Sequence, residues 1–113
     1  TLTSPTINTP KITTAYSNGN LGATPTIDWS KGDLQTGTLS ANCTYAFSNA
    51  VAGQRLTFFA LQNGTGTYTQ AFTPTIIWQD ATTPTWTVTA DKMNVFVIYF
   101  DGTNYYGMGA KFA

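Results

Sequence analysis

Two segments of the chain, residues 56–61 and 95–100, carry apolar side chains on both sides of an extended backbone. Side chains alternate along a strand, so Phe58 faces one side while Phe59 and Leu61 face the other. A strand covered on one face only would alternate apolar with polar residues. Both segments are therefore predicted to lie in a sheet whose second face is covered by another sheet, another chain or a heavy layer of side chains.

Turn signals follow both segments. Asn63-Gly64 predicts a tight hairpin leading into a strand that ends at Phe72, and Asp101-Gly102-Thr103-Asn104 predicts a second hairpin. Shorter runs predict further strands at 26–29, 34–39, 42–47, 76–78, 86–88 and 105–112. No amphipathic helix is present. About eight short strands at regular spacing predict an all-β fold, an antiparallel β-sandwich or jelly-roll-like domain.

A short repeat occupies the first residues. Leu2, Ile7 and Ile12 are five apart, and Pro5 and Pro10 share that spacing. Proline at this density forbids a helix and a central strand, which leaves an extended chain. Several parallel copies wound about an axis could bury the three apolar side chains. The alternative is an unstructured terminus or linker.

These patterns divide the chain into two parts. Residues 1–20 are predicted to be an extended, Thr/Pro-rich arm, and residues 21–113 a β-sandwich domain. A loop signal, Ser17-Asn18-Gly19-Asn20, marks the boundary. The start at Thr1 has no signal-peptide pattern, and we expect a fragment or a processed chain.

The surplus apolar face of the two double-faced strands favours self-association, because a two-sheet sandwich needs only one inward face per sheet. The alternative is that loops and the arm cover this face within one chain. The predicted oligomer interface consists of Leu2, Ile7, Ile12, Phe59 and Leu61.

Composition excludes most catalytic chemistry. The chain has no His and no Glu, so it has no Ser-His-Asp or Cys-His arrangement and no imidazole metal site. The Asp residues lie mostly in turn clusters, where backbone roles account for them. Cys43 is alone, which rules out an internal disulfide, and its strand pattern predicts a buried thiol. We therefore expect no enzyme activity, no metal and no cofactor.

The charge and the hydropathy of the chain argue against two classes of partner. Five basic residues balance five acidic ones and are scattered along the chain, which argues against nucleic acid. No apolar run is long enough for a spanning helix, so membrane insertion is not expected.

Aromatic residues beside polar loops suggest a saccharide site, since flat rings stack on sugars and amides bind hydroxyls. The alternative is ordinary packing at strand ends. The candidate ligand-binding residues are Trp78, Gln79, Trp86, Asn104, Tyr105 and Tyr106.

Several segments form a recognisable series: Ile27-Asp28-Trp29-Ser30, Phe47-Ser48-Asn49, Ala52-Gly53-Gln54, Gln62-Asn63-Gly64-Thr65-Gly66, Ile77-Trp78 and Phe100-Asp101-Gly102-Thr103. With this series the chain resembles a module of bacteriophage tail fibres, tail spikes and head fibres. The Thr/Pro-rich arm at residues 1–20 resembles their shaft repeats, which implies a shaft-like arm that trimerises. The resemblance implies a homotrimeric virion appendage on the particle exterior. Its partners would be copies of itself, other virion proteins and a host-surface glycan. The family pattern often has an acidic residue where this chain has Asn63, and no catalytic residue carries over.

The resemblance thus implies a non-enzymatic fibre or tip domain of a phage virion. Two rival classes stay open. One is a monomeric carbohydrate-binding module of a secreted enzyme, and the other is a capsid or tail decoration protein without a ligand.

Overall fold

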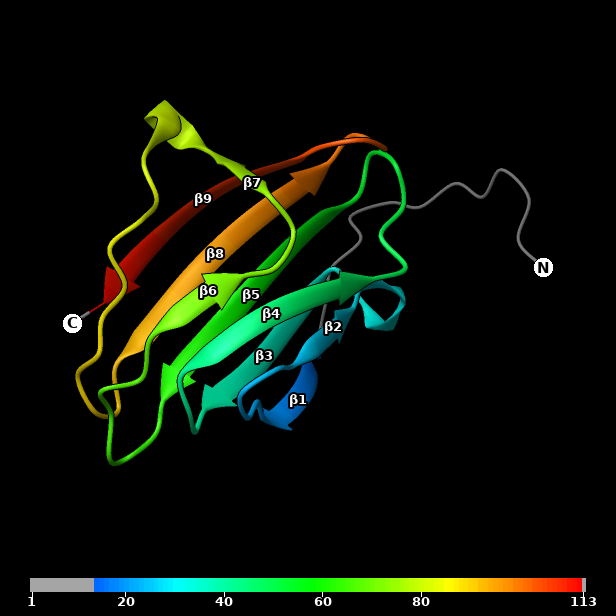
Figure 1. Cartoon of the computed structure of the whole chain (residues 1–113). Coiled ribbons are helices and arrows are strands. Elements are labelled where there is room, and N and C mark those ends of the chain that lie inside the picture. Colours follow the sequence, from blue (N-terminus) through cyan, green and yellow to red (C-terminus); the bar gives the residue numbers. More distant parts are fainter. Residues whose placement is uncertain (1–13, 113) are drawn as a thin grey trace.

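The computed structural model describes residues 14–112, which form nine β-strands and two short 3₁₀ helices (Figure 1). In chain order these are β1 (Tyr16–Asn20), β2 (Thr26–Asp28), η1 (Trp29–Lys31), β3 (Leu34–Leu39), β4 (Cys43–Ser48), β5 (Arg55–Gln62), β6 (Gln70–Phe72), β7 (Ile76–Trp78), η2 (Gln79–Ala81), β8 (Met93–Phe100) and β9 (Tyr105–Phe112). Within this range no helix has the length and apolar character needed to cross a membrane.

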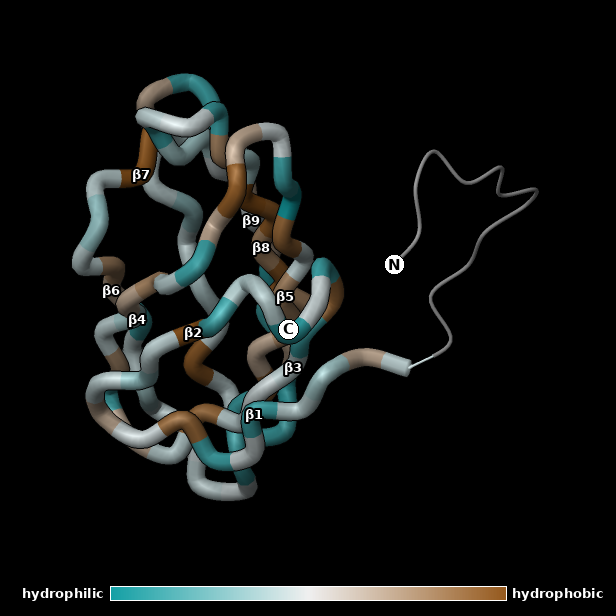
Figure 2. The backbone as a smooth tube through the Cα atoms, turned by 90° about the vertical axis from the view of Figure 1, so that its right-hand side faces the viewer, coloured by the Kyte–Doolittle hydropathy of each residue, from teal (hydrophilic) through white to brown (hydrophobic). Residues whose placement is uncertain are grey.

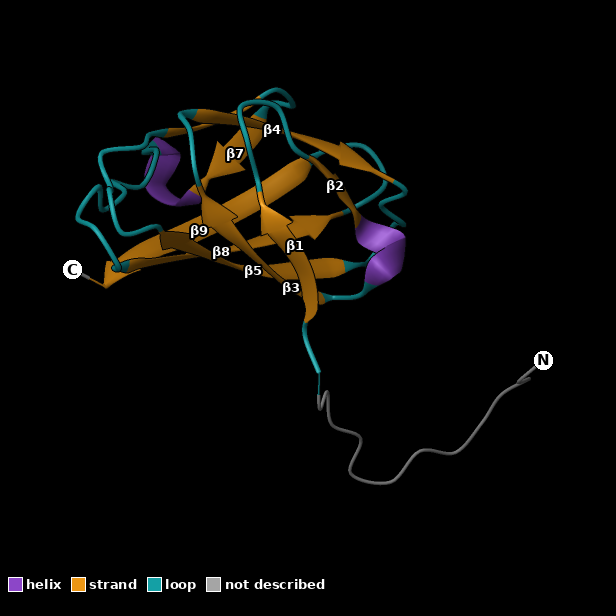
Figure 3. Cartoon of the chain, turned by 90° about the horizontal axis from the view of Figure 1, so that it is seen from below, coloured by secondary structure: helices purple, strands orange, loops and turns teal. Residues whose placement is uncertain are grey.

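The strands form two sheets that face each other (Figure 3). The larger sheet has six strands in the order β1-β3-β5-β8-β9-β7, and the smaller has three in the order β2-β4-β6. From β1 to β6 the chain alternates between the sheets, and each strand pairs in parallel with the strand two places earlier. This part of the fold is a flattened coil of three turns, each contributing one strand to either sheet.

The C-terminal part completes the larger sheet. β8 pairs antiparallel with β5 and with β9, and β7 pairs in parallel with the start of β9. In the turn between β8 and β9, a side-chain oxygen of Asp101 accepts hydrogen bonds from the backbone N–H groups of Thr103 and Asn104 at 2.8 and 2.6 Å. The hairpin predicted at residues 101–104 is confirmed.

The expected all-β fold is also confirmed, but the antiparallel pairing is wrong for much of it. Among the strands that the structure describes, five of the seven pairings are parallel and two are antiparallel. The reason is the coil: each strand is followed by a crossing to the opposite sheet. Its neighbour within a sheet therefore comes from another turn of the coil rather than from an adjacent hairpin.

The hairpin predicted around Asn63-Gly64 is likewise wrong. β5 lies between β3 and β8, whereas β6 lies in the other sheet beside β4. The side-chain oxygen of Asn63 accepts hydrogen bonds from the backbone N–H groups of Thr65 and Gly66 at 2.9 and 3.1 Å. Gly66 and Thr67 then adopt positive φ angles of 71° and 73°. This turn carries the chain from one sheet to the other.

The strand predicted at residues 86–88 is absent, and 82–88 have no regular secondary structure. Asn94 takes the place of a neighbouring strand here. Its side-chain oxygen accepts a hydrogen bond from the Thr87 N–H at 2.7 Å, and its amide donates to the Thr87 carbonyl at 3.1 Å. Both residues are buried, with Asn94 fully so. A buried side-chain amide thus satisfies backbone groups that a strand would otherwise pair.

The described residues include only the end of the predicted arm. Leu2, Ile7 and Ile12 lie outside them, so their part in an interface stays a prediction. Tyr16–Asn20 forms β1 and pairs with β3 at the edge of the larger sheet. These five residues therefore belong to the β-structured part of the chain.

The core fills the space between the sheets. Phe58 and Phe96 lie opposite each other on β5 and β8 and stack with ring centroids 5.0 Å apart. Tyr45, from the smaller sheet, packs edge-on against both at 5.7 and 5.2 Å. Cys43 is buried beside this group, as predicted.

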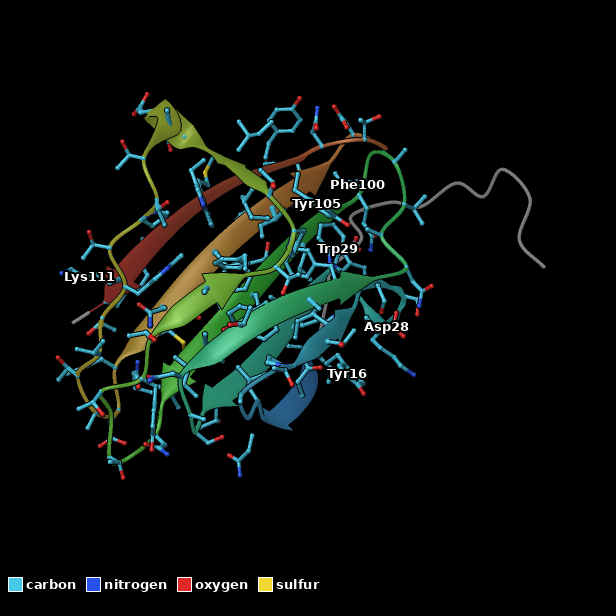
Figure 4. All side chains as sticks on the ribbon, in the orientation of Figure 1. Tyr16, Asp28, Trp29, Phe100, Tyr105 and Lys111 are labelled. Atoms are coloured by element: carbon cyan, nitrogen blue, oxygen red, sulfur yellow. The ribbon has the colours of Figure 1, made fainter. Side chains whose placement is uncertain are left out.

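A second aromatic group closes the end of the core near the β8–β9 hairpin. Trp29, Phe100 and Tyr105 lie together there (Figure 4). Trp29 is fully buried, and the Phe100 and Tyr105 rings stack with centroids 4.6 Å apart. This packing fixes the hairpin relative to the coil.

Candidate interaction surface

The outward side of the larger sheet collects the second apolar face of the two long strands. In β5 the even-numbered residues from Leu56 to Gln62 are buried between the sheets, which places Phe59 and Leu61 on the opposite side. The antiparallel register sets Phe59 beside Val95 and Leu61 beside Met93. The two residues predicted for an interface therefore lie side by side with the matching face of β8.

Neighbouring strands extend this surface. The outer face, as we name it, consists of Phe59, Leu61, Ile77, Met93, Val95, Val97, Tyr99, Tyr106, Met108, Ala110 and Phe112. Five of its members, Ile77, Tyr99, Tyr106, Met108 and Phe112, are between 40% and 58% exposed. Figure 2 shows hydrophobic segments along β8 and β9, which supply most of it. The outer face is thus a continuous apolar surface rather than scattered single side chains.

The outer face is nearly free of charge. Of the side chains that β3, β5, β8 and β9 direct to this side, only Arg55 is charged. It lies at the end of β5, opposite Tyr99. Thr36, Thr38 and Thr57 border the apolar residues. Covering this surface would therefore bury few charges, and charge burial is the costly part of forming an interface.

The size of the outer face and its shallow depressions suit contact with a protein. Three eight-residue strands cover roughly 26 by 14 Å, from a rise of about 3.3 Å per residue and a spacing of about 4.8 Å. Two shallow depressions lie on this side, of about 230 Å³ beside Val95 and Phe112 and about 200 Å³ beside Ile77 and Tyr99. Both are smaller than the roughly 300 to 1,000 Å³ typical of small-molecule pockets. They have the size of sockets for side chains of another surface.

The structure turns three of the residues predicted to bind a saccharide toward the core. Trp78 packs on Phe72 and Trp86, Trp86 packs on Phe72 and Phe96, and Tyr105 packs on Trp29. For these rings the alternative stated from the sequence, packing at strand ends, is what the structure has; which rings pack inward is set by residues distant in the sequence.

The other predicted binding residues, Gln79, Asn104 and Tyr106, lie at one end of the outer face. Gln79 and Tyr106 line the depression of about 200 Å³ with Tyr99, and Trp78 contributes to its wall. The Asn104 side-chain amide donates a hydrogen bond to the Tyr106 hydroxyl at 3.5 Å. Tyr99 and Tyr106 lie directly opposite each other on β8 and β9 and are 44% and 40% exposed. This group offers two tyrosine rings and two amides to a ligand.

Several outer-face residues were missed by the sequence reasoning. Met108, Ala110 and Phe112 alternate after Tyr106 in the last strand, which is the signal of a further apolar face. The glycines at 107 and 109 masked this alternation, because they occupy the inward positions where bulky core residues are expected.

Two of the described acidic groups accept hydrogen bonds within turns. Hydrogen bonds from the Ser30 and Asn49 side chains lower the pKa of Asp28, which begins η1. The backbone N–H groups of Asn104 and Thr103 lower the pKa of Asp101. Over residues 14–112, no three His, Cys, Asp or Glu side chains gather as a metal site would require.

Comparison with known proteins identifies no relative: the chain matches no protein-family model, no curated protein and no solved structure.

Proposed function

We propose that this chain is a non-enzymatic structural domain of a bacteriophage appendage, a tail fibre, tail spike or head fibre on the virion exterior, and that it assembles as a homotrimer. The outer face is the observation that carries the proposal. In the trimer, three sandwich-like domains bring their outer faces together around a common axis.

The energetics of the outer face support self-association. Exposed apolar patches of several hundred Å² mark interaction sites in soluble proteins. Apolar burial contributes about 25 cal/mol per Å². Contacts with two neighbouring copies would cover both the β5–β8 part and the β9 part of this surface. The low charge of the face keeps the desolvation cost small.

The resemblance supplies the biological setting. The segments that resemble phage appendage modules include turns around Asn49 and Asp101, and in this fold both turns lie where strands are joined at the same end of the domain. The backbone N–H of Gly53 donates to the Phe100 carbonyl at 2.7 Å, which ties the two turns together. The resembling segments therefore have a joint structural role, as expected for a scaffold rather than an enzyme.

The experiment is the solution mass of the full chain, by light scattering over a range of concentrations, beside two variants. Val95→Asp puts a charge in the middle of the outer face, and Val51→Asp puts one in a turn where the side chain is already 65% exposed. We expect a trimer for the parent and for Val51→Asp, and a monomer for Val95→Asp. A parent monomer at every concentration would contradict the proposal. Antibody labelling of phage particles in the electron microscope tests the location.

A second role, glycan binding, is favoured by the exposed pair Tyr99 and Tyr106 beside Gln79 and Asn104. Tyrosine rings stack on the apolar faces of sugars, and the amides bind their hydroxyls. The pair lies at one end of the outer face, where the rim of an assembly would leave it accessible.

The test is binding of the full chain to an array of bacterial surface polysaccharides. Tyr106→Ala should abolish binding, whereas Tyr16→Ala, with a similarly exposed ring at the far edge of the sheet (41%), should not. Trimers that bind no polysaccharide would favour a decoration protein. Monomers that bind one would favour a carbohydrate-binding module.

A further inference from the structure

The last strand is longer than its neighbour on one side. β9 spans eight residues, and β7 pairs only with its first three, Tyr105 to Gly107. Residues 108–112 pair with β8 on the other side through Phe112. On the β7 side, the described residues supply no strand partner to this second half of β9.

The hairpin fixes which backbone groups face that side. The Asp101 N–H donates to the Asn104 carbonyl at 3.2 Å, so these two form a hydrogen-bonded pair. Hydrogen-bonded and non-hydrogen-bonded pairs alternate along an antiparallel ladder. When this alternation is followed along the register of β8 and β9, Met108 and Ala110 fall in hydrogen-bonded pairs with β8. Gly109 and Lys111 therefore direct their N–H and C=O groups away from β8, toward the open side.

The open edge borders a groove. A depression of about 390 Å³ lies between β9 and the η2 loop, and its lining is Gln79, Asp80, Thr82, Pro84, Met108 and Gly109. No backbone hydrogen bond joins residues 108–112 to this loop in the described part of the chain. The far wall thus stands off from the strand, and the groove reaches the outward backbone groups at Gly109.

Other strand edges of the fold are blunted. β1 carries a register shift between Ser17 and Asn20, with Gly19 at a φ of 63°. The edge strands β2, β6 and β7 have three residues each. Bulges and very short strands are the usual protection of sheet edges. The second half of β9 is neither bulged nor very short. Its regular backbone can therefore pair with an added strand.

We propose that this edge takes one further strand, supplied by residues 1–13 of a second copy of the chain. The inference rests on the self-association proposed above and adds the element that links one copy to the next. Each copy would donate its N-terminal segment to the β9 edge of a neighbour, a head-to-tail contact that closes in a ring.

The position of the segment favours a neighbouring copy. The described chain begins at Thr14, just before β1, and β1 and β9 lie on opposite sides of the larger sheet. Four strand spacings separate them, about 19 Å at about 4.8 Å each. The segment of one copy would have to cross its own outer face to reach its own β9. In a ring, the β1 edge of one copy adjoins the β9 edge of the next.

The composition of the segment fits the edge. Pro5 and Pro10 lack an N–H, so the paired run is confined to Thr6–Thr9. Four residues suffice to pair with the two outward residues of β9. Lys11 is the one charged side chain in residues 1–13, and Asp80 is the one acidic side chain in the groove. The two charges are complementary.

Amide hydrogen exchange on the assembly of residues 1–113 tests the edge directly. If a strand is added, the Gly109 and Lys111 amides exchange as slowly as those of Met108 and Ala110, about 100-fold slower than the exposed Gly102 amide. Fast exchange at Gly109 and Lys111, with slow exchange at Ala110, overturns the proposal.

Matched variants identify the two sides of the contact. Lys111→Pro and Lys111→Thr both remove the charge, but only proline removes the outward N–H. Lys111→Pro should raise the exchange rate of Gly109 at least about 10-fold while Ala110 stays protected, and Lys111→Thr should not. Replacing both Ile7 and Asn8 by proline should act like Lys111→Pro, with Ile7→Val and Asn8→Ser together as the control. Unchanged Gly109 exchange in the double proline variant overturns the assignment to this segment.

Mass measurements separate this inference from the proposed function. A protected edge in the trimer that is lost on dilution to monomer supports donation between copies. A protected edge in the monomer assigns the strand to the same chain and overturns the second-copy donor. A trimer with an unprotected edge overturns this inference alone. A monomer with an unprotected edge overturns the proposed function as well.

Discussion

The indole ring of Trp86 lies directly over the backbone of Gly109 in β9. A Cβ added at Gly109 would lie 2.7 Å from Cζ3 of Trp86 and 3.1 Å from Cγ of Pro84, closer than packed carbon atoms come. The loop before β8 thus covers the inner face of β9 with a ring that fits only because residue 109 has no side chain.

Gly109→Ala should therefore destabilise the fold by about 1 to 3 kcal/mol, the usual range for overpacking a core. Gly64→Ala is the control, because nothing lies within 4 Å of the added Cβ there. Urea unfolding followed by tryptophan fluorescence measures both. Equal stability of the two variants would show that the loop carrying Trp86 moves aside at little cost.

The buried amide of Asn94 supports the same loop. Asn94→Ala would leave the N–H of Thr87 without its partner, whereas the Thr87 carbonyl still accepts a hydrogen bond from the Gln62 side-chain amide at 3.0 Å. An unpaired buried N–H costs about 1 to 3 kcal/mol, so we expect a loss of about that size in unfolding free energy, with faster hydrogen exchange at the Thr87 amide. Asn104→Ala, at an exposed position, should change the stability by less than about 0.5 kcal/mol. A small effect of Asn94→Ala would mean that water replaces the amide.

The Asp101 turn makes stability depend on pH. Backbone hydrogen bonds from Asn104 and Thr103 lower the pKa of the folded carboxyl below its ordinary value of 3.8. The resulting stabilisation is fully present above the unfolded pKa and is lost as the pH falls through the folded pKa. Unfolding free energy measured from pH 2 to pH 6 should rise with pH and then level off.

Asp101→Asn should reduce the rise in unfolding free energy by the part that Asp101 contributes. Asp28, whose pKa is also lowered in the folded protein, should contribute a second part that remains in this variant. The chain has no His and no Glu, so the Asp carboxyls and the chain terminus are the groups that titrate in this range. A pH profile unchanged in Asp101→Asn would contradict the assignment.

The Cys43 thiol should be inert in the folded protein. Burial raises its pKa to about 11, and the thiolate is the reactive form. At pH 8, a thiol reagent such as dithionitrobenzoate should react with Cys43 far more slowly in buffer than in 6 M urea. Equal rates in the two solvents would mean that the strand opens readily.

Local sequence patterns located most strands but not their partners. Alternation placed strands at 34–39 and 76–78, both of which the structure contains. The pairing of β3 with β5 depends on successive turns of the coil, a relationship between residues about 23 apart, such as Leu34 and Thr57. No local turn signal encodes it. Asn63-Gly64 does form a turn, but this turn leads the chain across the core to the other sheet instead of back along the same sheet.

The candidate surface was predicted only where it depends on alternation within one strand. Phe59 and Leu61 were correctly placed opposite the core side of β5, because alternation within one strand is local. Tyr105 was expected at a ligand site but stacks on Phe100 inside the fold. Its surroundings are set by Trp29, more than 70 residues away, and sequence alone does not bring the two together.

The neighbouring residues Phe58 and Phe59 offer the sharpest test of the two-faced strand. Phe58 is fully buried between the sheets, whereas Phe59 is half-buried on the outer face. Phe58→Ala removes a ring that stacks on Phe96 and should lower the unfolding free energy by about 3 to 5 kcal/mol at every protein concentration. Phe59→Ala should leave the monomer nearly as stable and weaken association, so that the midpoint of unfolding depends less on concentration. Urea unfolding over a 100-fold range of protein concentration, with light scattering on the same samples, distinguishes the two. If Phe59→Ala lowered the stability of the monomer as much as Phe58→Ala does, the outer face would be part of the fold of one chain and not a contact between copies.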